Sequence, residues 1–246
     1  KRIQQAILPS DEDVKMLLPE SFILYRPKDV VSGDFYFVES TKTTEETPRK
    51  FVVVGAIDCT GHGVPAAMLS VIGIDGLLHV LENNTMADTS TLLNKLNAEV
   101  SAHFSQSGTN LTDGLDIGLC RFDMTKGELC FSGAYHSCWI YRDNQLIELK
   151  GNRTSIGRME SPIRFIGHRH LLQKGDMLYL FTDGVYDQFG GANSRKLMRK
   201  QLRKILEEIE RLPMEQQADS FKQAWNNWKG NEEQTDDMCL IGIRWI

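Results

Sequence analysis

Four aspartates that lie far apart in the chain each stand at the end of an apolar run typical of a β-strand. Asp34 begins one such run, Asp58 closes a second, Asp183 follows a third, and Asp236 precedes the last. Carboxylates at neighbouring strand ends repel one another and raise each other's pKa unless a divalent cation neutralises them. Ligand sets made only of oxygen suit Mg2+ or Mn2+ better than Zn2+. We therefore expect a fold in which these strand ends meet at a hard-cation site.

The spacing of apolar residues predicts strands joined mostly by hairpins, with helices grouped in pairs. Runs typical of strands occupy residues 22–26, 34–39, 51–57, 116–122, 128–134, 137–141, 145–149, 177–182 and 238–245. Helical spacing occupies residues 64–77, 93–104, 198–212 and 218–228. This pattern predicts an α+β fold in which antiparallel sheets are covered by helices. With 246 residues, 41% of them hydrophobic, the chain is long enough for one such domain.

Composition excludes several classes of function. The net charge of -5 argues against nucleic-acid binding and against contact with an anionic membrane, because both require a basic surface. No apolar stretch is expected to span a membrane, and the polar N-terminus is no signal peptide. The five cysteines form no C-x-x-C pair, which indicates reduced thiols in a cytoplasmic domain. Because the chain begins with lysine, we expect a piece of a longer protein, which could carry a membrane anchor.

The segment Asp58-Cys59-Thr60-Gly61-His62-Gly63 lies where a strand gives way to a helix. Free backbone N–H groups at a helix start favour a bound anion such as phosphate. The same glycines also match the spacing of a dinucleotide fingerprint, with Glu82 about 20 residues further on. That alternative requires a parallel sheet and an acid at the end of the next strand, whereas Glu82 lies in a helical pattern. It predicts binding of NAD(P).

Four short motifs together resemble the PPM-type metal-dependent serine/threonine phosphatases, in particular their bacterial SpoIIE/RsbU-like branch. In chain order they are Ser32-Gly33-Asp34-Phe35, Asp58-x-x-Gly61-His62-Gly63, Thr182-Asp183-Gly184-Val185 and Asp236-Asp237-Met238. The resemblance implies two packed antiparallel β-sheets flanked by helix pairs, an α-β-β-α sandwich, with two Mn2+ or Mg2+ ions between the sheet ends. It implies as metal ligands Asp34, Asp58, the backbone carbonyl of Cys59, Asp183 and Asp236. Whether Asp236 or its neighbour Asp237 is the ligand is left open by the register.

The resemblance also implies an activity, the hydrolysis of phosphoserine or phosphothreonine esters by a metal-bridged water. Asp58 is expected to bridge the two ions. His62 either protonates the leaving alkoxide or simply orients its loop. The family's typical substrate is a phosphorylated anti-sigma-factor antagonist, so a partner of that kind is expected. The alternative is a catalytically inactive regulatory or phosphoprotein-binding module of the same fold.

Other features carry weaker expectations. Residues 1–10 resemble the end of a linker helix from an upstream regulatory or sensor domain, a candidate contact for a homodimer, and residues 11–246 form the phosphatase domain. Asp113 and Asp116 flank Gly114, which favours a turn over a third metal position. The basic residues between Arg195 and Lys204 have helical spacing and predict a solvated helix face, with a docking patch for an acidic phosphoprotein as the alternative. No role is assigned to the histidines at positions 136, 168 and 170.

Overall fold

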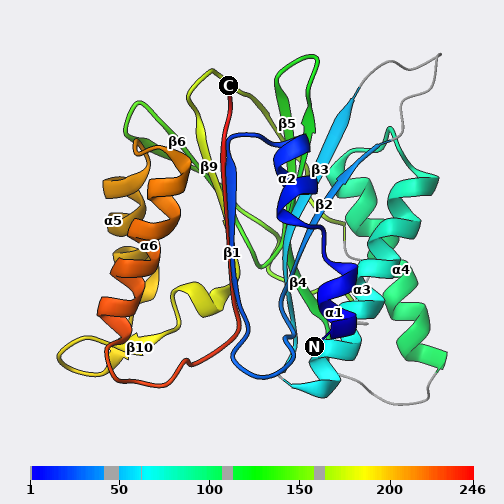
Figure 1. Cartoon of the computed structure of the whole chain (residues 1–246). Helices are drawn as coiled ribbons and strands as arrows, with labels where there is room; N and C mark the ends of the chain where they lie inside the picture. Colours follow the sequence, from blue (N-terminus) through cyan, green and yellow to red (C-terminus); the bar gives the residue numbers. More distant parts are fainter. Residues whose placement is uncertain (1, 42–49, 62, 107–112, 158–163) are drawn as a thin grey trace.

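Two five-stranded antiparallel sheets pack face to face, and a pair of helices covers the outer face of each (Figure 1). The computed structural model describes residues 2–41, 50–61, 63–106, 113–157 and 164–246. The arrangement confirms the expected α-β-β-α sandwich. Every pairing within the two large sheets is antiparallel, so the parallel sheet that a dinucleotide-binding fold requires is absent from the described residues, and that alternative is wrong.

The strand order explains how distant segments become neighbours. The first sheet has the order β1 (Ser21–Arg26), β12 (Met238–Arg244), β9 (Met177–Phe181), β6 (Cys138–Arg142) and β7 (Gln145–Leu149). The second has the order β2 (Phe35–Ser40), β3 (Phe51–Cys59), β4 (Leu115–Asp123), β5 (Glu128–Ala134) and β8 (His168–Leu171). A two-stranded ribbon joins β10 (Phe189–Gly190) to β11 (Arg195–Lys196). The C-terminal strand β12 thus lies between β1 and β9.

The helices form two layers and a short N-terminal pair. The helices α3 (Val64–Asn83) and α4 (Thr89–Gln106) cover the second sheet, while α5 (Met198–Ile209) and α6 (Met214–Lys229) cover the first (Figure 1). Near the N-terminus, α1 (Arg2–Ile7) and α2 (Asp11–Leu17) precede β1. The strands β1 and β2 are edge strands of different sheets, and α2 lies over the side of the sandwich between them (Figure 1). Its Val14 is buried in the inter-sheet core.

Three apolar layers follow from this stacking. Strand β3 is apolar on both faces because both faces are covered: Val52 and Val54 point into the layer between the sheets, and Val53 and Ile57 into the layer under α3 and α4. The third layer lies between the first sheet and the pair α5–α6, where Trp225 is fully buried. All five cysteines are buried and reduced, as expected.

Several local elements are not predicted from the sequence. The segment at Pro9-Ser10-Asp11 does end a helix, but Ser10 also starts α2, because its side chain accepts from Asp13 N and Asp13 accepts from Ser10 N. The strand β8 was missed because its residues are alternately half-buried and exposed at a sheet edge. The residues 40–50 were expected to connect a hairpin; β2 and β3 pair antiparallel, and residues 42–49 lie outside the described part.

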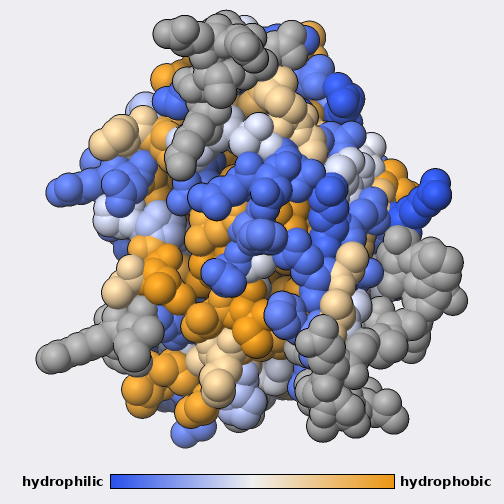
Figure 2. All heavy atoms as spheres, turned by 90° about the vertical axis from the view of Figure 1, so that its right-hand side faces the viewer, coloured by the Kyte–Doolittle hydropathy of each residue, from blue (hydrophilic) through white to orange (hydrophobic). Residues whose placement is uncertain are grey.

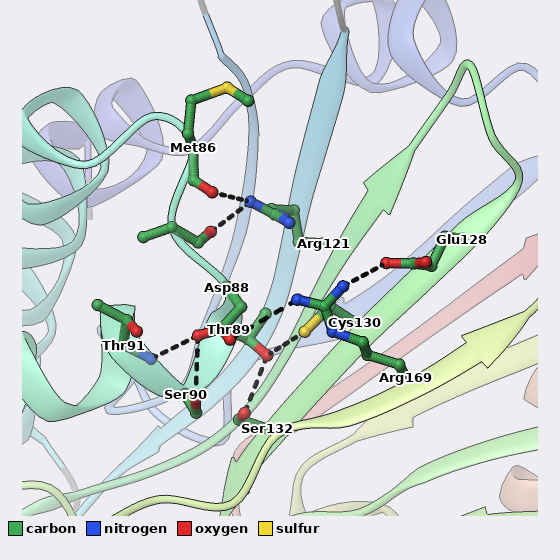
Figure 3. A network of polar contacts seen from close by, with 11 residues as sticks. Met86, Asp88, Thr89, Ser90, Thr91, Arg121, Glu128, Cys130, Ser132 and Arg169 are labelled. Carbon is green, nitrogen blue, oxygen red and sulfur yellow. Dashed lines mark hydrogen bonds and ion pairs between the residues drawn. The ribbon is translucent and has the colours of Figure 1, made fainter.

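A polar network fastens the α3–α4 connection onto the second sheet (Figure 3). The buried Arg121 of β4 lies 4.3 Å above the Phe51 ring and donates to the carbonyl oxygens of Met86 and Ala87. At the start of α4, Thr89 Oγ1 lies 2.9 Å from Ser132 Oγ of β5. Because these bonds join helix ends to strands, they fix the helical layer relative to the sheet. Further outside, three charged residues extend the network, Asp88, Glu128 and Arg169.

The helix α3 departs from one expectation. By length and composition it is apolar enough to cross a membrane, with a mean hydropathy of 1.8, and it is the only such helix in the described ranges. No such stretch is predicted from the sequence. Residues along one side of α3 are buried against the second sheet and α4, as in the core helix of a globular domain. Its length and composition alone are therefore weak support for a membrane span.

Candidate metal centre

The register of the strands brings the four predicted aspartates to one end of the sandwich. In the second sheet Phe35 pairs with Ile57, so the next step along the ladder sets Asp34 opposite Asp58. In the first sheet, adjacent strands place Asp183, in the 3-10 turn η1 (Asp183–Val185) after β9, beside Asp236, just before β12. Each sheet thus contributes two carboxylates to the same end, as the sequence predicts.

The carboxylates raise one another's pKa. Burial, and then the charges of Asp237 and Asp183, raise the pKa of Asp34 well above its ordinary value. Burial and the charges of Asp34 and Asp183 likewise raise the pKa of Asp58. For Asp183, burial and the charge of Asp236 raise the pKa to about 6. This mutual repulsion between groups on facing sheets is what a divalent cation would relieve.

The two adjacent acids at positions 236 and 237 occupy different environments. The buried carboxylate of Asp237 accepts two backbone N–H groups, from Lys28 at 2.7 Å and from Gly33 at 2.8 Å. It therefore fastens the loop that leads to Asp34. By contrast, Asp236 is half-buried, and its Oδ1 accepts from the backbone N of Asp237 at 2.8 Å. Since both oxygens of Asp237 are already bonded, Asp236 is the better candidate for a ligand.

Close backbone approach at Gly33 sets the position of Asp34. A Cβ atom at Gly33 would lie 2.9 Å from Ala66 Cβ and 3.2 Å from the carbonyl oxygen of Cys59. Only glycine fits there without a shift of its neighbours. The Cys59 carbonyl, a predicted ligand, therefore faces the Asp34 loop, while the Cys59 thiol is buried and its pKa is raised by burial.

A second glycine brings the strand ends of the first sheet together, and its replacement tests this packing. A Cβ at Gly184 would lie 1.8 Å from the carbonyl oxygen of Asp237. We expect Gly184→Ala to separate η1 from β12, to lower the free energy of unfolding by about 2–4 kcal/mol, and to weaken metal binding. Urea unfolding and calorimetric titration with Mn2+ measure both effects. Gly167→Ala is the control, because its φ is ordinary and its added Cβ would meet no atom closer than Ser90 Oγ at 3.3 Å. Unchanged metal binding in Gly184→Ala would contradict this account.

The donor set fits a hard cation. In the part of the chain that the structure describes, no three histidine, cysteine or acidic side chains already converge tightly enough to hold an ion. Yet Asp34 Oδ2 is buried and has no hydrogen-bond partner, although buried carboxylate oxygens are normally satisfied. A cation bound among these carboxylates would supply the missing partner of this oxygen and reduce the repulsion between the charges. Small side-chain movements would bring the ligands close enough. The chemistry of these donors matches Mg2+ or Mn2+.

Other predicted residues have different outcomes. His62 lies outside the described residues, so its role stays a prediction. Asp116 lies in β4 directly opposite Asp58, rather than in a turn, and its charge contributes to the raised pKa of Asp58. Periodicity could not reveal this, because it required the register between β3 and β4. His136 is buried, and burial lowers its pKa to about 4.

The basic residues between Arg195 and Lys204 were predicted to lie on one helix face, and the structure shows that they do not. Arg195 and Lys196 belong to β11, and α5 begins only at Met198. Lys196 pairs with Asp187 at 2.7 Å, and Arg199 pairs with Glu148 and lies over the Trp139 ring. Because these cations have partners within the domain, the solvated-face reading fits better than a docking patch.

The chain is similar to several known proteins. The sequence model of the family Stage II sporulation protein E (SpoIIE) matches residues 48–246. The phosphoserine phosphatase RsbU of Bacillus subtilis (strain 168) is 27% identical over 190 residues, 74% of this chain and 50% of RsbU. The SiaA-PP2C domain of Pseudomonas aeruginosa is 30% identical, with a TM-score of 0.88 over 100% of this chain and 94% of that one. The PP2C phosphatase domain of SpoIIE from Bacillus subtilis, at 18% identity, shares the fold with a TM-score of 0.72 over 92% of this chain and 63% of that one.

These findings define a PP2C-type domain of the kind found in serine/threonine phosphatases. The chain belongs to the SpoIIE family, whose model matches most of its length. It spans about half the length of the RsbU protein that it matches. The PP2C-type fold implies dependence on a divalent metal.

Proposed function

We propose that this domain removes phosphate from phosphoserine or phosphothreonine in a partner protein, with two Mn2+ or Mg2+ ions at the candidate metal centre. The observation that carries the proposal is the convergence of Asp34, Asp58, Asp183 and Asp236 from two sheets. Burial, and then mutual repulsion, raise the pKa of the first three. The relationship to the phosphoserine phosphatase RsbU supports the same activity.

The chain's own residues have distinct parts in this proposal. Asp58 has Asp34 opposite it on one neighbouring strand and Asp116 on the other, so it is the carboxylate best placed to be shared between two ions. Asp34, Asp183, Asp236 and the Cys59 carbonyl complete the ligand set. Bound there, the ions supply a water of lowered pKa as nucleophile. We assign to His62 the protonation of the leaving oxygen.

The start of α3 supports binding of the phosphate. Gly63 precedes the helix with a φ of 75°, and no side chain of the described residues caps the first turn. The first N–H groups of the helix are therefore available to an anion, and the helix dipole favours negative charge there. A phosphoester at this end of the sandwich would meet these groups and the carboxylate-held ions together.

We further propose the biological setting by analogy with the relatives. The substrate is a phosphorylated anti-sigma-factor antagonist, and residues 1–10 connect the domain 11–246 to an upstream regulatory or sensor domain. A homodimer through the N-terminal helix fits the same arrangement, and the domain acts in the cytoplasm. No nucleic acid and no direct membrane contact enter this proposal.

The proposal is tested by phosphate release from p-nitrophenyl phosphate and from a phosphothreonine peptide. Turnover is expected with Mn2+ or Mg2+, is lost in EDTA, and returns when Mn2+ is restored. Calorimetric titration with Mn2+ runs in parallel. Saturable metal binding without turnover would favour the inactive phosphoprotein-binding module. The absence of metal binding would contradict the proposed enzymatic activity.

The contact of α1 with the site predicts an effect of Gln4. This buried side chain donates to the Ser32 carbonyl at 2.5 Å and lies 3.1 Å from Ser70 Oγ of α3, while its Oε1 accepts from Ser32 N. Gln4→Ala would leave these groups unpaired two residues before Asp34, so we expect a loss of about 1–3 kcal/mol in the free energy of unfolding and weaker Mn2+ binding. Urea unfolding and metal titration measure both.

Gln216→Ala on the exposed side of α6 is the matched control for this substitution. Equal behaviour of the two variants would show that α1 is not coupled to the metal centre.

A further inference from the structure

The outward face of α3 is apolar and exposed in its first half. Val64 and Met68 each have 66% of their surface exposed, Val71 has 43% and Ile72 has 40%. Residues spaced by three, four and seven positions share one face of a helix, so these four side chains form one continuous stripe. We call it the α3 stripe. Figure 2 shows apolar surface gathered on the lower part of the face that the α3–α4 layer presents.

The outward faces of α5 and α6 carry charged pairs, and among their residues only Met198, the first residue of α5, is a large apolar side chain that is exposed. In α5 the exposed residues include Arg203, paired with Glu207 at 2.7 Å, and in α6 they include Lys222, paired with Asp219 at 3.3 Å. Single exposed apolar residues are ordinary, but a row of four on one helix face is typical of a surface that another protein covers. The α3 stripe is therefore a feature that needs a partner.

The position of the stripe indicates which partner. It begins at Val64, six residues after Asp58, at the helix end that borders the candidate metal centre. With a helix rise of about 1.5 Å per residue, the eight steps from Val64 to Ile72 extend roughly 12 Å. An interface of ordinary size buries about 800 Å² on each side, which is a patch roughly 30 Å across. A protein whose phosphoester reaches the metal centre would therefore also cover the α3 stripe.

The chemistry of the site supplies a second reason. The centre is built from aspartates, which recognise no protein sequence and repel a phosphoprotein until cations are bound. Affinity for one particular substrate therefore has to come from surface next to the centre. The only charged residue that continues the line of the stripe over the next turn is Asp75, so the surface is suited to apolar rather than charged contacts.

We propose that the α3 stripe is the docking surface for the protein substrate, and that this substrate presents apolar side chains beside its phosphorylated serine or threonine. The inference rests on the proposed phosphatase function and adds to it the class of surface that the substrate must carry. Docking through the stripe raises the affinity for a phosphoprotein and leaves the chemistry at the metal centre unchanged.

The test compares a protein substrate with a small one. The Met68→Lys, Val71→Lys double variant places two charges on the stripe, and both side chains are exposed, so the fold is kept. Met16→Lys on α2, where the side chain is 75% exposed, is the matched control. We expect the double variant to raise KM for phosphorylated casein about 10-fold or more, with kcat and the kcat/KM for p-nitrophenyl phosphate changed less than about 2-fold, because only uniform binding is lost.

Binding is measured apart from turnover, by fluorescence anisotropy of labelled phosphocasein in the presence of Mn2+. A weaker affinity in the double variant alone supports docking even where turnover is slow. Equal affinity and equal KM in all three proteins would overturn it. A dimer of the starting protein that dissociates in the double variant, seen by analytical ultracentrifugation with phosphocasein affinity unchanged, would assign the stripe to a second copy instead. If the starting protein binds metal but hydrolyses neither substrate, the phosphatase function fails, whereas the anisotropy still decides docking.

Discussion

The Asp58→Asn variant is expected to lose metal-dependent phosphatase activity almost completely. Asp58 lies between Asp34 and Asp116 in the strand register, and the charges of four other aspartates contribute to its raised pKa. Its carboxylate is therefore the most central of the site. An amide cannot supply the negative charge that holds two cations. Charge stabilisation by a metal contributes several kcal/mol, so we expect a fall in kcat/KM of roughly 10³-fold or more.

The measurement is Mn2+-dependent release of phosphate from p-nitrophenyl phosphate, together with calorimetric Mn2+ binding. Asp219→Asn is the matched control, since this aspartate lies on α6 with 81% of its side chain exposed. Asparagine has nearly the same shape as aspartate, so the fold of Asp58→Asn is expected to be kept and its circular dichroism unchanged. Activity within about 10-fold of the starting protein would contradict the central role of Asp58.

The stability of the metal-free protein is expected to fall as pH rises. The pKa of Asp183 is raised from 3.8 to about 6 in the folded protein, so folding favours its protonated form. The stabilisation is fully present below the unfolded pKa and is lost as pH rises through about 6. For Asp183 this is about 2–3 kcal/mol at neutral pH, since one pKa unit corresponds to about 1.4 kcal/mol. The raised pKa values of Asp34 and Asp58 act in the same direction.

Urea unfolding in EDTA at pH 4.5 and pH 7.5 measures this loss. Because many other groups titrate, the comparison is with Asp183→Asn, which removes one contribution. The variant is expected to be more stable than the starting protein at pH 7.5 without metal, with a smaller difference at pH 4.5. Mn2+ at neutral pH should reverse the order, since only the starting protein keeps the full ligand set. A variant less stable at pH 7.5 in EDTA would show that repulsion does not dominate.

Much of the architecture could be predicted from periodicity and turn signals. The nine strand-like runs and four long helices are present, and their grouping into hairpins and helix pairs is what the apolar spacing indicates. The misses have local reasons. Strand β8 is a polar edge strand with Leu171 as its one apolar residue, and the basic run is divided because Arg195 and Lys196 pair with β10 before α5 begins at Met198. Such choices are made by tertiary contacts, which outweigh local propensity.

The candidate site, like the fold, was predicted from the sequence only in part. Each of the four aspartates could be identified from its place at a strand end, because side-chain chemistry and strand boundaries are local properties of the chain. The structure alone distinguished the buried Asp237, bonded to Lys28 N and Gly33 N, from the half-buried Asp236 beside it.

By itself, the sequence determined the residue types, the strand ends and hence the kind of cation site this protein can form. Only the tertiary structure decided which acids face one another, that Asp116 lies opposite Asp58 across β3 and β4, and that the α3 stripe stays exposed. The physical reason is that register and packing depend on contacts between residues far apart in the chain, whose pairing no local pattern specifies.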